Sequence, residues 1–164
     1  MKTAIIYKSI HHGNTKKIAE AMVNALEAEL FDLKDANHDI IKEYDLIGFG
    51  SGIYFSKPHK KLRKFVEDLD NVENKKAFVF STSGSKKPSN AQRLGHRKSF
   101  DFRASKFNDL LKNELSKKGF EILGEFNCKG FDTWGPFKLI GGLNKGKPDE
   151  EDLKNAAEFA KSLK

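Results

Sequence analysis

Short apolar runs and segments of helical periodicity take turns along this chain. Apolar runs of strand length occupy residues 3–7, 44–50 and 76–81, and shorter or mixed runs occupy 29–33 and 120–128. Between them, apolar residues recur at the three- and four-residue spacing of one helix face. These faces are formed by Ile18, Met22, Ala25 and Leu26, by Leu62, Phe65, Val66 and Leu69, by Phe107, Leu110, Leu111 and Leu115, and by Leu153, Ala156, Ala157 and Ala160. The pattern predicts five strands that alternate with helices.

Alternating strands and helices imply right-handed crossovers and a parallel sheet covered on both faces. We therefore expect an α/β fold: a three-layer, doubly wound, five-stranded parallel sheet of order 2-1-3-4-5. At 164 residues, the chain fits a single domain spanning 1–164. In this order the switch point lies between strands 1 and 3, and ligands bind beyond the carboxyl ends of the strands there. The loops at those ends, residues 9–15, 51–58 and 82 to about 100, are expected to flank one crevice.

The first of these loops carries residues suited to binding a phosphate. It reads Ser9-Ile10-His11-His12-Gly13-Asn14-Thr15 and lies directly before the first helix, whose unpaired N-terminal amides attract anions. Ser9 and Thr15 add hydroxyl donors, and Gly13 permits close backbone approach. The same residues also suit a plain helix cap. The chain has no G-x-x-x-x-G-K-[ST] or G-x-S-x-G run, and the glycines at 48, 50 and 52 lack dinucleotide spacing.

The pattern Ser9-x-x-x-Gly13-Asn14-Thr15 after a first strand resembles the FMN-phosphate loop of the flavodoxin family, and the resemblance extends over nearly the whole chain. It implies FMN as cofactor and a flavin ring cradled by the loops after strands 3 and 4. The implied cofactor-binding residues are Ser9, His11, Gly13, Asn14 and Thr15 for the phosphate, and Ser51, Gly52, Ile53, Tyr54, Phe55, Ser81, Thr82, Ser83 and Gly84 for the ring. Since a flavin carries the redox chemistry, no catalytic side chain is expected. Tyr54 and Phe55 suit ring stacking or packing in a loop.

The resemblance favours an electron-transfer protein that exchanges electrons with a redox partner protein. Two alternatives stay open. One is a small FMN-dependent oxidoreductase acting on a quinone or a porphyrin-like small molecule. The other is a flavin-free binding protein that uses its basic loops for an acidic partner.

The net charge of +7 departs from the acidic character of typical flavodoxins. The cations gather in two clusters, Lys57, Lys60, Lys61, Arg63 and Lys64, and Lys86, Lys87, Arg93, Arg97, Lys98 and Arg103. Such clusters are either solvated surface or a docking surface for an acidic partner. Nucleic acid is not expected, because no recognised binding module accompanies the charge.

Two further segments are longer than a minimal flavodoxin needs, residues 84–100 and 131–147. Trp134, in the second, suits either a lid over the flavin edge or a local cap. No apolar stretch approaches the roughly 20 residues that span a bilayer, and the single Cys128 excludes an internal disulfide, so a cytoplasmic protein is expected. No metal site is expected at His11 and His12, because no Cys, Asp or Glu lies in matching local spacing.

Overall fold

The computed structural model describes residues 1–84 and 102–164, with side chains from 106 onward in the second range. The described elements are β1 (Thr3–Lys8), α1 (Asn14–Leu26), β2 (Glu29–Asp32), α2 (Ile40–Glu43), β3 (Leu46–Tyr54), β4 (Lys57–Pro58), α3 (Lys60–Glu67), β5 (Lys76–Ser83), α4 (Phe102–Lys117), β6 (Glu121–Lys129), the 3-10 helix η1 (Gly135–Ile140) and α5 (Glu150–Lys161). Within the two described ranges, no helix combines the length and apolar content that crossing a membrane requires.

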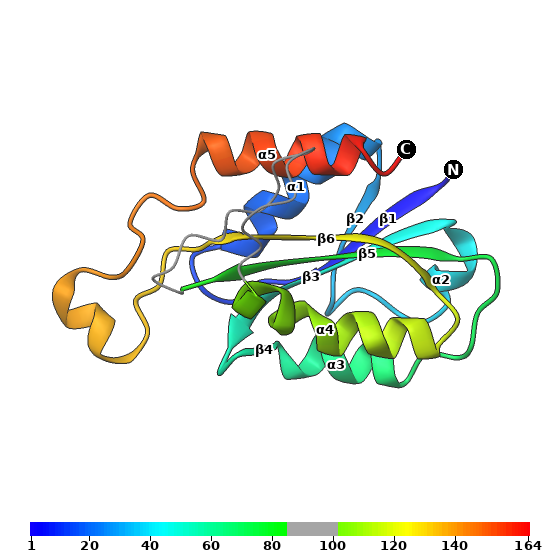
Figure 1. Ribbon diagram of the computed structural model, residues 1–164, viewed down its shortest axis with the longest axis horizontal. Helices are drawn as coiled ribbons and strands as arrows, with labels where there is room; N and C mark the ends of the chain where they lie inside the picture. Colours follow the sequence, from blue (N-terminus) through cyan, green and yellow to red (C-terminus); the bar gives the residue numbers. More distant parts are fainter. Residues whose placement is uncertain (85–101) are drawn as a thin grey trace.

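The main sheet is parallel and has the order β2-β1-β3-β5-β6. The short β4 pairs antiparallel with the end of β3, so the five long strands follow the predicted order 2-1-3-4-5. Helices α1 and α5 cover one face of the sheet, and α3 and α4 cover the other (Figure 1). The predicted doubly wound α/β fold is confirmed.

Strand alternation divides the apolar side chains between two cores, one on each face of the sheet. On the α3/α4 face, Phe49 and Val79 pack with Leu111 of α4. On the α1/α5 face, Phe78 and Phe80 pack with Phe159 of α5 in an aromatic group. The helices cover both cores. This packing on both faces fixes the position of the carboxyl ends of the strands.

Two glycines of β3 have a role that the sequence pattern hides. The predicted strand ends at residue 50, but β3 continues to Tyr54. Gly48 pairs across the sheet with Phe78, and Gly50 pairs with Phe80. A methyl group at either glycine would collide with the partner's ring. These glycines therefore make room for large rings on the neighbouring strand.

The predicted helices are present, but two of the predicted faces are wrong in detail. In α4, Leu110 is exposed, and Asn108 is buried one turn before Leu111. In α5, Phe159 is buried together with Ala156 and Ala160, whereas Ala157 lies at the edge. The longer side chain of Phe159 reaches the aromatic core, which a count of spacing alone does not show. Most of the predicted 84–100 loop, and the cations from Lys86 to Lys98, lie outside the described residues.

Candidate functional site

A crevice of about 150 Å³ opens at the carboxyl ends of β1, β3 and β5, where the switch point was predicted. Eleven of the predicted site residues line it: Ser9, His11, Asn14, Thr15, Gly52, Ile53, Tyr54, Phe55, Thr82, Ser83 and Gly84. They come from three strand ends far apart in sequence. The fold therefore brings most of the predicted site together.

The loop between β1 and α1 presents hydrogen-bond donors without partners. His12 and Gly13 both have left-handed backbones, with φ values of 54° and 68°, and no side chain caps α1. Within the described residues, the backbone N–H groups of Thr15 and Lys16 meet no acceptor. The Ser9 hydroxyl is buried and also lacks a partner there. A concave set of free donors at a helix N-terminus is the usual cradle for an anion.

Thr15 connects this loop to β5, which lies two strands away from β1 in the sheet. Its hydroxyl lies 2.9 Å from the hydroxyl of Thr82 in β5, and both side chains are buried. One of the two hydroxyls donates to the other, so the accepting residue keeps its own proton for another acceptor. The contact fixes the start of α1 relative to β5.

The other side of the crevice is formed by the β3–β4 hairpin. Tyr54 pairs with Lys57 across a two-residue turn, and Phe55 and Ser56 at its tip have φ values of 49° and 62°. Positive φ at both positions is the pattern of a type I′ turn, which favours glycine and asparagine. The turn points the Phe55 ring outward, where it is 84% exposed. A bulky residue in this conformation is strained, and such strain is commonly kept where it serves a site.

Tyr54 stands between two histidines at the mouth of the crevice. Its ring centroid lies 5.7 Å from that of His11 and 5.5 Å from that of His59. Burial and the carboxylate of Asp132 raise the pKa of Tyr54, so its hydroxyl stays protonated at neutral pH. A Cβ at Gly52 would lie only 2.8 Å from the Tyr54 hydroxyl, so this glycine leaves room for the ring.

Three predicted residues do not line the crevice. Gly13 lies behind it as the N-cap position of α1. Ser51 faces the α3/α4 side, where its hydroxyl accepts from the His59 amide at 2.8 Å. Ser81 faces the same side and accepts from the Asn127 amide at 2.6 Å. Because β3 and β5 run past both serines, strand alternation sends these side chains away from the crevice.

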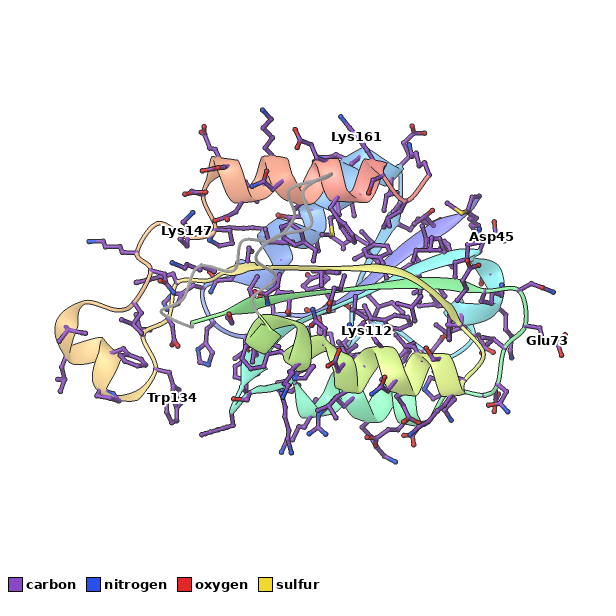
Figure 2. All side chains as sticks on the ribbon, in the orientation of Figure 1. Asp45, Glu73, Lys112, Trp134, Lys147 and Lys161 are labelled. Carbon is purple, nitrogen blue, oxygen red and sulfur yellow. The ribbon has the colours of Figure 1, made fainter. Side chains whose placement is uncertain are left out.

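The segment after β6 supplies crevice residues that were not among the predicted ligands: Gly130, Phe131, Asp132 and Trp134, together with Ile10 of the first loop. Asn14 donates to the Phe131 carbonyl at 2.8 Å, and His12 hydrogen-bonds Thr133 at 2.8 Å. Asp132 accepts from the Trp134 amide at 2.8 Å. This segment leaves the body of the fold beside the crevice and carries Trp134 outward (Figure 2).

Trp134 contacts Phe55 across the mouth of the crevice. The two rings meet edge to face with centroids 5.5 Å apart, and the Trp134 side chain is 55% exposed. The sequence predicted Trp134 as a lid or a local cap. The predicted strand order already indicated this position of Trp134, because the fifth strand ends at the same sheet edge as the fourth.

A doubly wound sheet with a crevice at its switch point is typical of a class of ligand-binding α/β proteins. The comparisons with known proteins identify the family: residues 4–127 match the Flavodoxin domain family, and the chain belongs to it. It is 51% identical to an uncharacterized protein of Methanocaldococcus jannaschii over 163 residues, covering 99% of this chain and 98% of that protein. It is 27% identical to the flavodoxin-like domain-containing protein BilS of Clostridioides difficile, covering 94% of this chain and 80% of that protein.

A solved structure shows the same fold. The oxidised flavodoxin 1 of Bacillus cereus superposes with a TM-score of 0.67 at 18% identity, covering 99% of this chain and 97% of that chain. At this identity the likeness concerns the fold, which is that of flavodoxins.

Proposed function

We propose that the crevice binds FMN and that the protein is an electron carrier. The observation that carries this proposal is the buried Ser9 hydroxyl without a partner among the described residues, beside an α1 N-terminus that no side chain caps. Burying a hydroxyl without a hydrogen bond costs roughly 1–3 kcal/mol. A phosphate bound there would accept from Ser9 and from the free amides of Thr15 and Lys16 together. Membership of the flavodoxin domain family gives the same expectation.

In this proposal each crevice loop has its own task. The loop of Ser9 and Thr15 binds the phosphate. The backbone at Gly52 and Gly84 lines the crevice beside the ring, and Phe55 and Trp134 shield the ring from water on its open side. Bound FMN supplies one- and two-electron redox chemistry, and the protein tunes it through the groups around the ring. No side chain of the crevice has to transfer a proton for electron exchange.

The exposed rings at the mouth of the crevice favour a carrier. Phe55 and Trp134 both line the crevice, and their side chains are 84% and 55% exposed. A flat ligand would displace these rings from their mutual contact and leave its outer edge at the surface beside them. Such an edge would be open to a docking protein.

Titration with FMN and with riboflavin tests the cofactor and its phosphate site together. We expect FMN to remain on the protein after desalting, with the absorbance bands of bound flavin. Ser9→Ala should weaken FMN binding by about 10-fold or more, since a hydrogen bond to a charged group is worth roughly 1.5–3 kcal/mol. Binding of riboflavin, which lacks the phosphate, should not change. Ser116→Ala, on the exposed face of α4, is the matched control.

Two results would overturn the proposal. A protein that retains no flavin from excess FMN contradicts flavin binding altogether. Steady-state oxidation of a nicotinamide donor by a quinone, without any partner protein, contradicts the carrier function and favours the small oxidoreductase.

A further inference from the structure

Exposed apolar side chains occur at the mouth of the crevice and on the 3-10 helix that follows Trp134. Among the described residues, seven large hydrophobic side chains are exposed; three of them line the crevice and two lie on η1. We call these five the rim patch: Ile10, Phe55, Trp134, Leu139 and Ile140. Leu139 and Ile140 are 89% and 70% exposed on η1, which follows Trp134 directly. In a 3-10 helix residues three apart eclipse one another, so Phe137 and Ile140 lie on the same side of η1.

The crevice-lining loops lie within stretches of the chain that have a net positive charge. Residues 51–66 and 129–147 contain nine of the 30 lysines and arginines but only Asp132 of the 23 acidic residues. The rest of the chain has 21 cations and 22 anions, so it is nearly neutral. Lys57 follows the tip of the β3–β4 hairpin, and Lys138 precedes Leu139 on η1. Within the described residues neither lysine has an ion-pair partner, whereas Lys64 and Lys147 do.

We propose that the rim patch is the docking site of an acidic protein, whose contact surface has an apolar centre ringed by aspartates and glutamates. Exposed apolar patches with a polar rim mark interaction sites, and tryptophan and other aromatic side chains dominate binding energy at such sites. The rim lysines steer an acidic protein toward the patch and fix its orientation. That this partner exchanges electrons rests on the proposed function. Its docking through apolar and charged contacts does not.

The patch is held ready for binding. Trp134 is fixed through its amide to Asp132, and Phe55 is held outward by the strained hairpin turn. Little conformational freedom is then lost when a partner docks, which favours affinity. A partner seated on Phe55 and Trp134 would cover the crevice, since both side chains also line it. A redox protein docked there would lie next to the crevice. A membrane bound to the same side chains would instead cover the crevice with lipid.

A second copy of this chain is a poor occupant. In a two-fold symmetric dimer the same patch meets itself. Lys57 and Lys138 of each copy, which have no ion-pair partner within the described residues, would then lie in one interface with the same lysines of the other copy, and like charges at an interface oppose association.

Site-specific photo-crosslinking captures a docked protein and identifies it in the same experiment. A photoreactive amino acid at position 139 is compared with the same group at position 110, an exposed leucine of α4 away from the patch. The full chain is irradiated in extracts of the cells that produce it, and the products are identified by mass spectrometry. We expect one acidic protein captured from 139 and not from 110. The yield of this crosslinked product should fall in about 0.5 M salt, where the Debye length shortens to a few ångströms.

Charge reversal supplies the control on specificity. Lys57→Glu with Lys138→Glu should lower the yield by about 10-fold, because the two substitutions turn attraction of an acidic surface into repulsion. Lys161→Glu, at the end of α5 (Figure 2), should leave it unchanged. No product, a basic protein, a lipid, a second copy of this chain, or equal capture from 110 would each overturn the proposal. Flavin retention is measured separately, so loss of docking and loss of FMN binding are distinguishable.

Discussion

Phe55 is held in a backbone conformation that its side chain disfavours. Left-handed φ costs a non-glycine residue roughly 1–2 kcal/mol, and asparagine tolerates it best. Because the ring is 84% exposed, its loss removes little beyond the edge contact with Trp134. We therefore expect Phe55→Asn to raise the free energy of unfolding by about 0.5–1 kcal/mol while weakening flavin retention. Urea unfolding and FMN titration measure the two effects. A loss of stability instead would show that the Trp134 contact outweighs the strain.

His59 makes stability depend on pH. Its Nδ1 accepts from the Lys61 amide at 3.1 Å and caps α3, so the neutral ring is the form that the fold uses. Burial lowers the pKa of His59, and Lys8, Lys61, Lys60 and Arg63 lower it further. As pH falls through the ordinary histidine range near 6.5, the unfolded chain gains a proton that the folded chain does not. The free energy of unfolding should therefore decrease, until the lowered folded-state pKa is reached.

His59→Asn separates this effect from the other histidines. Asparagine is a good N-cap and does not titrate, so the helix start is kept. Urea unfolding between pH 8 and pH 5 should show a shallower loss of stability in the variant than in the natural protein. Parallel curves for the two proteins would contradict the assigned role.

Between elements, Asn14 latches the segment after β6 onto the start of α1. Its amide donates to the Phe131 carbonyl at 2.8 Å, and a Cβ on Gly130 would lie 2.6 Å from that amide. Asn14→Ala leaves a partly buried carbonyl unpaired, which costs about 1 kcal/mol. We expect the segment to loosen, so that the fluorescence anisotropy of Trp134, the single tryptophan, decreases. Asn24→Ala, on the exposed face of the same helix, should leave the anisotropy unchanged. Unchanged anisotropy in Asn14→Ala would contradict the latch.

The order of elements was predictable because buried parallel strands read as apolar runs and helices as spaced apolar faces. Side-chain direction at the strand ends was harder. Ser51 and Ser81 look like loop residues, and only the continued pairing of β3 with β5 shows that they turn away from the crevice. The hairpin tip at Phe55 and Ser56 lacks the usual turn residues, so the local sequence did not predict the turn. The contacts of Phe131 and Thr133 join segments over 100 residues apart, beyond any local pattern.

At the scale of the whole molecule, the Gly–Phe pairs between the central strand β3 and β5 fix the position of the crevice. Gly50 lies opposite Phe80, and a methyl group there would overlap the Phe80 ring. We expect Gly50→Ala to lower the free energy of unfolding by about 1–3 kcal/mol through overpacking. Phe80→Leu removes the ring atoms that the methyl meets. The double variant should then be more stable than the sum of the single changes predicts, by about 1 kcal/mol.

Gly48 provides the matched control for this coupling, because its collision is with Phe78 and not with Phe80. Phe80→Leu should therefore fail to rescue Gly48→Ala, although both glycines lie on one strand and face the same core. Urea unfolding of the single and double variants measures both couplings. Equal rescue at the two positions would mean that the aromatic core relaxes as a whole. Rescue at Gly50 alone would show that each glycine is matched to the ring opposite it in the register of β3 and β5.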